Sequence, residues 1–185
     1  GIRCIIMVPT RELAAQIADV FRKLAHHTRV QTVAVYGGVE QDPQIEKLVK
    51  GVDVLVTTPG RLFDLVSQGY IKLDKIETLV LDEADQMLNL GFYKDIVDLI
   101  RFLPKKRQTL FFSATIDKKI KKLAYSLVKT KAIRIQISPK NPVSKNVTHA
   151  ITFVEMDDKR FCLERILKEN PDLKFMVFVR TKVRA

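Results

Sequence analysis

Three carboxylates, Asp82, Glu83 and Asp85, directly follow the apolar run Thr78–Leu81. Such a run is typical of a buried strand, and in open parallel sheets ligands bind outside the carboxyl ends of the strands. Carboxylate oxygens suit Mg²⁺, which takes one or two of them together with waters and phosphate oxygens. A neighbouring carboxylate is well placed to orient or deprotonate an attacking water. Taken alone, the same acids fit a helix N-terminus equally well, because the helix dipole favours negative charge there.

Four further loops that carry polar or glycine residues follow apolar runs. A helix N-terminus with free amides binds anions, an arginine adds a bidentate donor, and paired glycines allow the backbone to approach closely. At one edge of a sheet, these loops would together outline a groove for a phosphodiester chain. The residues concerned are Thr10, Arg11, Glu12, Gly37, Gly38, Thr58, Gly60, Arg61, Ser113 and Thr115.

Each of these loops also has an explanation that needs no ligand. Thr10 and Thr58 are residue types that cap helices, and Pro59 is ordinary in a first helical turn. The pair Gly37–Gly38 is ordinary in a tight turn. Taken singly, the loops favour these structural explanations; only their combination favours a groove.

The elements that must position these loops alternate along the chain. Short apolar runs alternate with amphipathic segments of helix length, which predicts an α/β fold with a buried parallel sheet flanked by helices. Gly51 and Gly69 stand where left-handed helix ends are expected, and Gly91 marks a break between two helices. The predicted strands are 3–8, 31–36, 53–57, 78–81, 108–112 and 132–137, and the predicted helices are 11–26, 43–50, 60–68, 83–88, 92–102 and 118–128.

A change of composition marks a domain boundary. Residues 138–146 contain two prolines, no acid and one apolar residue, which predicts a linker. After it we expect strand 150–154, helix 159–169 and strand 175–179. The sequence therefore predicts a first domain over 1–137 that lacks its N-terminal part, and over 147–185 the start of a second domain too short to complete a layered fold.

Composition excludes several classes of protein. With 185 residues, 46% of them apolar and 29% charged, the chain is not intrinsically disordered. No run approaches the roughly 18 apolar residues of a membrane span, and the start lacks the pattern of a signal peptide. Cys4, Cys162 and the three histidines have no spacing typical of a zinc site or a disulfide framework. We therefore expect a soluble protein of a reducing compartment, with no membrane partner.

The net charge of +11 points to a polyanionic partner, with nucleic acid favoured over a membrane. Much of the excess lies in residues 101–134, which contain eleven basic residues and one acid, Asp117. Within this stretch the lysines of 118–122 surround the apolar Ile120 and Leu123. That pattern favours a solvated helix face over direct phosphate contact.

The order and spacing of the motifs carry more weight than any one of them. PTRELAAQ (9–16), GG (37–38), TPGR (58–61), VLDEAD (80–85) and SAT (113–115) together resemble the DEAD-box RNA helicase family of superfamily 2. The resemblance covers 1–137 as most of a first RecA-like domain. Residues 175–181 resemble the family's motif IV through Phe178 and Thr181 only, and a buried strand ending in a polar turn explains them as well.

The resemblance implies a role for each motif residue. In this family two RecA-like domains close over ATP and single-stranded RNA. For the present protein we expect a cytoplasmic location. Asp82 would hold Mg²⁺ through its water shell, Glu83 would position and activate the hydrolytic water, and Asp85 would hydrogen-bond toward Ser113 and Thr115 to couple the two sites. The residues that would line the RNA backbone are Thr10, Arg11, Glu12, Gly38, Thr58, Gly60 and Arg61.

Some motifs of the family do not occur in these 185 residues. There is no GxxxxGKT or GxxxxGKS loop to cradle phosphates and no upstream glutamine motif, and we expect both to precede Gly1. The arginine motif of the second domain would follow Ala185. We therefore expect the function of an ATP-dependent RNA helicase in the complete protein and inactivity of this fragment alone. The alternatives are a non-catalytic RNA-binding or protein-docking module, and a DNA-directed relative or other nucleotide-dependent motor.

Overall fold

The computed structural model describes residues 1–127, 132–137 and 147–179. The chain divides into two compact units, Gly1–Arg134 and Ile135–Ala185, which are described separately below. The predicted linker, 138–146, lies outside the described residues. The described elements are β1 (Cys4–Met7), α1 (Arg11–Leu24), β2 (Thr32–Val35), α2 (Asp42–Val49), β3 (Val54–Thr57), α3 (Pro59–Ser67), β4 (Thr78–Leu81), α4 (Ala84–Asn89), α5 (Tyr93–Phe102), β5 (Gln108–Phe111), α6 (Lys118–Leu127) and α7 (Lys159–Glu169).

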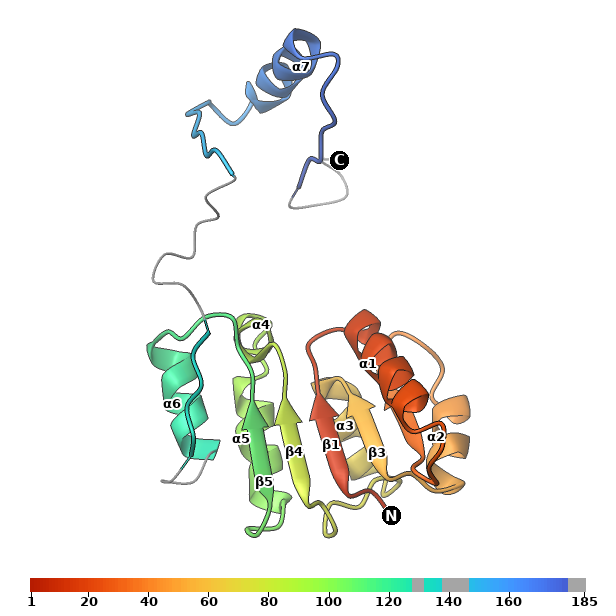
Figure 1. Ribbon diagram of the computed structural model, residues 1–185. Helices are drawn as coiled ribbons and strands as arrows, with labels where there is room; N and C mark the ends of the chain where they lie inside the picture. Colours follow the sequence, from red (N-terminus) through yellow and green to blue (C-terminus); the bar gives the residue numbers. More distant parts are fainter. Residues whose placement is uncertain (128–131, 138–146, 180–185) are drawn as a thin grey trace. The chain divides into compact units, whose positions relative to one another are not determined.

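The first unit is built on a parallel sheet of five strands in the order β2-β3-β1-β4-β5 (Figure 1). The central strand β1 pairs with β3 on one side and β4 on the other, so that Ile5 lies beside Leu55 and Leu79. Figure 1 shows α1 on one face of the sheet and α3 and α5 on the other. The predicted α/β fold with a parallel sheet flanked by helices is confirmed.

Burial on both faces explains why the strands are almost continuously apolar. Ile5, Leu55 and Leu79 are fully buried in the larger core, which also holds the apolar faces of α3 and α5. The neighbouring residues Ile6 and Val56 point to the opposite face and pack against α1 in a second core. A sheet covered on both faces needs apolar residues at successive positions, unlike a sheet with one solvated face.

The glycines predicted to end helices have the expected conformation. Gly51 follows α2 with φ of 105°, Gly69 follows α3 with φ of 82°, and Gly91 separates α4 from α5 with φ of 92°. A residue with a Cβ atom is strained in this region, so glycine lets each helix stop and the chain turn back toward the sheet.

Three predicted strands are wrong. No strand is present at 132–137, where Ile133 and Ile137 are 89% and 91% exposed. In the second unit the described residues form the helix α7 but no strand at 150–154 or 175–179. A β-branched run becomes a strand only where a neighbouring strand supplies hydrogen-bond partners, and local sequence does not say whether one is there. The other elements end within two residues of the predicted bounds.

The second unit contributes few buried side chains. None of the residues of α7 is buried, and Phe161 is 57% exposed.

Among the described helices of the whole chain, none is both long and apolar enough to cross a membrane.

Candidate functional site

All five strands are parallel, so the loops that follow them meet at one edge of the sheet (Figure 1). Hydrogen bonds continue the ladder past the strand ends and hold the loops in register. The amide of Val8 donates to the Thr57 carbonyl at 2.9 Å, and the amide of Asp82 donates to the Met7 carbonyl at 3.0 Å. The amide of Phe112 donates to the Leu81 carbonyl at 2.8 Å. The sheet itself therefore fixes the relative positions of the motifs.

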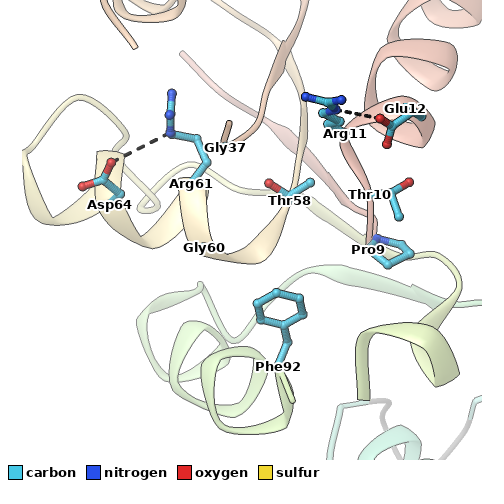
Figure 2. Close-up of a pocket in the computed structure, with 10 residues that line it drawn as sticks. All are labelled: Pro9, Thr10, Arg11, Glu12, Gly37, Thr58, Gly60, Arg61, Asp64 and Phe92. Atoms are coloured by element: carbon cyan, nitrogen blue, oxygen red, sulfur yellow. Dashed lines mark hydrogen bonds and ion pairs between the residues drawn. The ribbon is translucent and has the colours of Figure 1, made fainter. Parts of the chain in front are cut away.

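A pocket of about 510 Å³ lies at this edge, between the loops that follow β1, β2 and β3 and the start of α5 (Figure 2). It brings together six of the seven residues predicted to line a nucleic-acid backbone; Gly38 is represented by its neighbour Gly37. The sequence reasoning missed two lining residues, Asp64 and Phe92. The pocket is lined by Pro9, Thr10, Arg11, Glu12, Gly37, Thr58, Gly60, Arg61, Asp64 and Phe92.

Arg11 and Glu12 form the solvent-exposed side of the pocket. The Arg11 Nε donates to Glu12 Oε1 at 2.6 Å, and the two side chains are 57% and 70% exposed. This hydrogen bond raises the pKa of Arg11 and lowers the pKa of Glu12. Exposed pairs of this kind contribute little to stability, so the guanidinium is free to exchange its partner for a phosphate.

Arg61 is held differently. Its side chain is only 11% exposed, and its Nη2 donates to the Val39 carbonyl at 3.0 Å. Its Nε lies 3.9 Å from an Asp64 carboxylate oxygen, and its buried Nη1 has no hydrogen-bond partner among the described residues. A buried unpaired donor on a cation is costly, which makes this atom a candidate for a ligand hydrogen bond.

The two threonines of the pocket differ in the use of their hydroxyls. Thr10 caps α1, since its Oγ1 accepts from the Leu13 amide at 3.3 Å. Thr58 occupies the cap position of α3 but its side chain makes no capping hydrogen bond. The capping explanation is therefore confirmed for Thr10 and is wrong for the Thr58 side chain. Pro59 does stand in the first turn of α3, as its structural explanation predicts.

The glycine loop borders the pocket through Gly37 and lies near Arg11 through Gly38. Gly38 has φ of 79°, a conformation that favours glycine. A Cβ atom at Gly38 would stand 3.7 Å from Nη1 of Arg11, so the backbone of this loop passes close to the guanidinium. Gly38 thus adjoins the pocket without being part of its lining.

Phe92 lies on the far side of the pocket from Arg11 and Arg61 (Figure 2). It precedes α5 directly after the helix break at Gly91, and it is partly buried against the main core. The only signal in the sequence was the Gly91–Phe92 break itself, which marks where two helices change direction but says nothing of where an aromatic ring points.

The carboxylate turn follows β4 with an unusual backbone. Glu83 has φ of 51° and ψ of 46°, the one non-glycine residue with positive φ among the described residues. This left-handed conformation costs an ordinary residue about 1 to 2 kcal/mol. The Glu83 amide donates to Oδ1 of Asp82 at 3.0 Å, which offsets part of the strain and orients the Asp82 carboxylate.

Asp85 links this turn to the loop that follows β5. Its Oδ2 accepts hydrogen bonds from both the amide and the hydroxyl of Thr115, each at 2.9 Å. The Ala84 amide donates to the Phe112 carbonyl at 3.1 Å, a third connection between the two loops. Ser113 does not bond to Asp85; its hydroxyl donates to the Thr115 carbonyl at 2.7 Å and so supports Asp85 only indirectly.

The environment of Asp85 shifts its ionisation. The side chain is buried, and burial alone would raise its pKa, but the Thr115 hydroxyl and the amides of Thr115 and Gln86 stabilise the ionised form. The net effect lowers the pKa of Asp85. Asp85 is therefore a charged, fully engaged carboxylate whose oxygens are occupied by protein donors.

The residues at this edge fit a magnesium ion that is held mainly by water molecules and phosphate oxygens. Among the described residues, no three histidine, cysteine or acidic side chains gather as a metal-binding group. Asp82 is partly exposed and its carboxylate is fixed by the Glu83 amide. Mg²⁺ needs only one or two carboxylates beside water and phosphate oxygens, so the donor set suits that ion.

Known proteins with similar sequences are RNA helicases. The chain is 43% identical over 182 residues to the ATP-dependent RNA helicase RhlB of Shewanella oneidensis, covering 97% of the chain and 41% of that protein. It is 44% identical over 182 residues to the RhlB of Shewanella sediminis, with 97% and 42% covered. The chain thus spans about two fifths of the length of these curated relatives.

Solved structures agree with this similarity. The yeast DEAD-box splicing factor Prp28 matches with a TM-score of 0.66 and 33% identity, over 70% of this chain and 31% of that one. A hypothetical ATP-dependent RNA helicase from Sulfolobus tokodaii matches with a TM-score of 0.65 and 37% identity, over 70% and 39%. Residues 1–123, which contain every motif at the sheet edge, match the DEAD/DEAH box helicase family. The chain belongs to this family, and its first unit has the RecA-like fold.

Proposed function

We propose that the complete protein is an ATP-dependent RNA helicase, in which RNA-stimulated ATP hydrolysis drives local unwinding of a duplex. The observation that carries this proposal is the sheet edge. It holds a pocket with two arginines and a glycine loop, and beside it two carboxylates next to a third that is tied to the neighbouring loop. The relatives named ATP-dependent RNA helicase support the same conclusion.

The pocket is proposed to bind the RNA backbone. The exposed Arg11 guanidinium contacts phosphate, and Arg61 adds a second positive charge to the lining of the pocket. Contacts of this kind grip phosphate and sugar and read no base, so little sequence preference is expected. The residues assigned to this role are Thr10, Arg11, Glu12, Gly38, Thr58, Gly60 and Arg61.

The carboxylate turn is proposed to serve ATP hydrolysis. Asp82 holds Mg²⁺ through its water shell, and Glu83 orients and deprotonates the attacking water. When bound, the ion would supply positive charge that offsets the negative charge of the phosphate oxygens. Glu83 has a left-handed backbone and its amide donates to Oδ1 of Asp82, so the turn fixes the Asp82 carboxylate next to the proposed base.

The link between Asp85 and Thr115 is proposed to couple the two sites. Both loops follow adjacent strands, and three hydrogen bonds join them. A displacement of the carboxylate turn during the ATP cycle therefore moves the loop that contains Ser113 and Thr115. In this role Asp85 and Thr115 link the two loops through hydrogen bonds and take no part in breaking the phosphate bond.

The test is RNA-stimulated ATP hydrolysis by the complete protein, with and without Mg²⁺. We expect hydrolysis to require Mg²⁺ and to rise when single-stranded RNA is added. RNA binding without any hydrolysis would instead favour the non-catalytic RNA-binding or protein-docking module. Stimulation by DNA but not by RNA would favour the DNA-directed relative. We also propose a cytoplasmic location, which fractionation of cells that contain the tagged protein tests.

A further inference from the structure

Gln44, in the first turn of α2, is a buried polar side chain whose hydrogen bonds are all made to one loop. It is 7% exposed. Its Oε1 accepts from the Tyr36 amide at 2.9 Å, while its Nε2 donates to the carbonyls of Tyr36 at 3.2 Å and Glu40 at 2.9 Å. The primary amide thus satisfies backbone groups at both ends of the loop 36–40, which contains the two glycines.

This loop needs an external support. Two consecutive glycines give the backbone more conformational freedom than any other pair, so the loop pays a high entropic cost for a single conformation. Gln44 fixes its two ends, and Arg61 holds its middle through the Val39 carbonyl at 3.0 Å. Within the described part of the chain, no protein acceptor receives the amides of Gly37 and Gly38. The supports therefore hold the loop by other groups and leave the glycine amides available.

The position of Gln44 separates support from contact. Gly37 lines the pocket and Gly38 approaches Arg11, but Gln44 itself is not among the lining residues. From these observations we propose that Gln44 is a positioning residue for RNA binding, which holds the glycine loop so that its free amides and the Arg11 guanidinium face the RNA backbone together. The proposal rests on the proposed function of the pocket and adds a residue outside it.

The test compares variants of the complete protein in titrations with a labelled single-stranded RNA, beside ATP affinity and thermal midpoint. Gln44→Leu keeps the approximate size and removes all three hydrogen bonds, while Gln44→Glu keeps an acceptor for the Tyr36 amide but places a carboxylate against two carbonyls. Gln108→Leu is the matched control, because Gln108 is an exposed glutamine at the amino end of β5, whereas the pocket lies at the carboxyl ends of the strands. We expect both Gln44 variants to weaken RNA binding about five- to tenfold, with ATP affinity and the control within about twofold of the parent.

A double-mutant cycle with Gly38→Ala distinguishes positioning from general destabilisation. An alanine at φ of 79° strains the same loop directly. If Gln44 acts through the loop, the loss of RNA affinity in the double variant is clearly smaller than the product of the two single losses. In addition, hydrogen exchange at the Tyr36 amide should accelerate in Gln44→Leu and not in Gln108→Leu.

The outcomes separate this proposal from the function on which it rests. The role of Gln44 alone is overturned if folded Gln44→Leu binds RNA within twofold of the Gln108→Leu control, or if the losses in the cycle multiply independently. Should Gln44→Leu fail to fold, the same criteria apply to Gln44→Glu. A parent protein that binds no RNA overturns the proposed function and this inference together.

Discussion

Arg11 and Arg61 line the same pocket, but their side chains stand in different environments. Arg11 is exposed and paired with an equally exposed glutamate, whereas Arg61 is mostly buried, bonded to the Val39 carbonyl and left with one unpaired donor. An exposed contact to phosphate requires mainly a positive charge, which a lysine supplies as well as an arginine. A buried guanidinium that joins several groups depends on its planar fork, which lysine does not reproduce.

This difference predicts distinct responses to substitution. In the complete protein, Arg11→Ala and Arg61→Ala should each weaken RNA binding nearly uniformly across sequences and reduce the slope of log affinity against log salt by about 1. Arg11→Lys should retain most of the affinity, while Arg61→Lys should not. RNA titrations at several salt concentrations measure this, with Arg22→Ala as the control, since Arg22 lies on α1 outside the pocket. Unchanged slopes in both alanine variants would refute the phosphate contacts.

The ionised Asp85 makes part of the stability depend on pH. Because its folded-state pKa is lowered, its contribution is present above the unfolded value of about 3.9 and is lost as the pH falls through the folded-state pKa. Thr115→Val removes one donor to the carboxylate and should cost about 1.5 to 3 kcal/mol at pH 7, with a smaller cost at pH values below 4. Urea denaturation of Thr115→Val and of the parent, at pH 7 and at a pH below 4, measures the difference in the free energy of unfolding. Ser113→Ala is the control, because its hydroxyl bonds to a carbonyl and its effect should not change with pH.

At the scale of elements, the turn between β4 and α4 combines strain with chemistry. Its left-handed Glu83 is the residue assigned to the attacking water, and backbone strain of this kind concentrates at functional sites. The turn is held at both ends, by the Asp82 amide on Met7 and by the Ala84 amide on Phe112. A side chain on so constrained a turn is already directed before its substrate binds.

Glu83→Gln keeps the size and hydrogen bonding of the side chain and removes the base. In the complete protein we expect it to reduce ATP turnover by roughly 10² to 10⁴, with nucleotide affinity changed far less and an ATP-bound, RNA-clamped state accumulating. Asp82→Asn should instead weaken Mg²⁺-dependent nucleotide binding itself. Turnover assays and nucleotide titrations of both variants separate the two roles. If Glu83→Gln hydrolyses ATP within a few-fold of the parent rate, the alternative is favoured in which these acids only stabilise a helix N-terminus.

Elements of the first unit could be predicted well because each strand of its sheet combines an apolar run with an equally apolar neighbour. The strand predicted at 132–137 is absent, since a strand-like composition does not by itself decide whether a segment joins a sheet. The candidate site likewise has features that the sequence predicts and features that it does not. Parallel strands bring their loops to one edge, so motif residues such as Thr58 could be placed together from the sequence. The burial of Arg61, the backbone of Glu83 and the support from Gln44 depend on contacts between distant segments, which no local pattern contains.

At the scale of the whole molecule, the proposed activity requires that two events at one sheet edge depend on each other. The pocket proposed to bind RNA lies beside the loops after β1, β2 and β3, and the carboxylate turn and its partner loop follow β4 and β5. Because β1 adjoins both β3 and β4, the central strand joins the two halves of the edge. The net charge of +11 adds a general attraction for polyanions that favours encounter with RNA of any sequence.

Coupling across this edge predicts a separation of activities. Changing Ser113 and Thr115 together to alanine should leave ATP binding largely intact and lower duplex unwinding more than ATP hydrolysis. The Thr115 hydroxyl joins the two loops and the Ser113 hydroxyl supports Thr115, while neither hydroxyl bonds to the assigned catalytic pair. Parallel unwinding and hydrolysis assays of the complete protein measure the ratio. Equal losses of both activities would show that the pair merely supports the site.

The place of β1 at the centre of the sheet also constrains how the chain acquires its structure during synthesis. β1 leaves the ribosome before either of its neighbours, yet its partners are Val54–Thr57 on one side and Thr78–Leu81 on the other. Its backbone and its apolar side chains therefore stay unpaired until both later strands have emerged. Pairings so distant in sequence form slowly, and an unpaired apolar strand is prone to aggregate. Until β4 has emerged, one edge of this apolar segment therefore stays exposed on the nascent chain and open to binding by a chaperone.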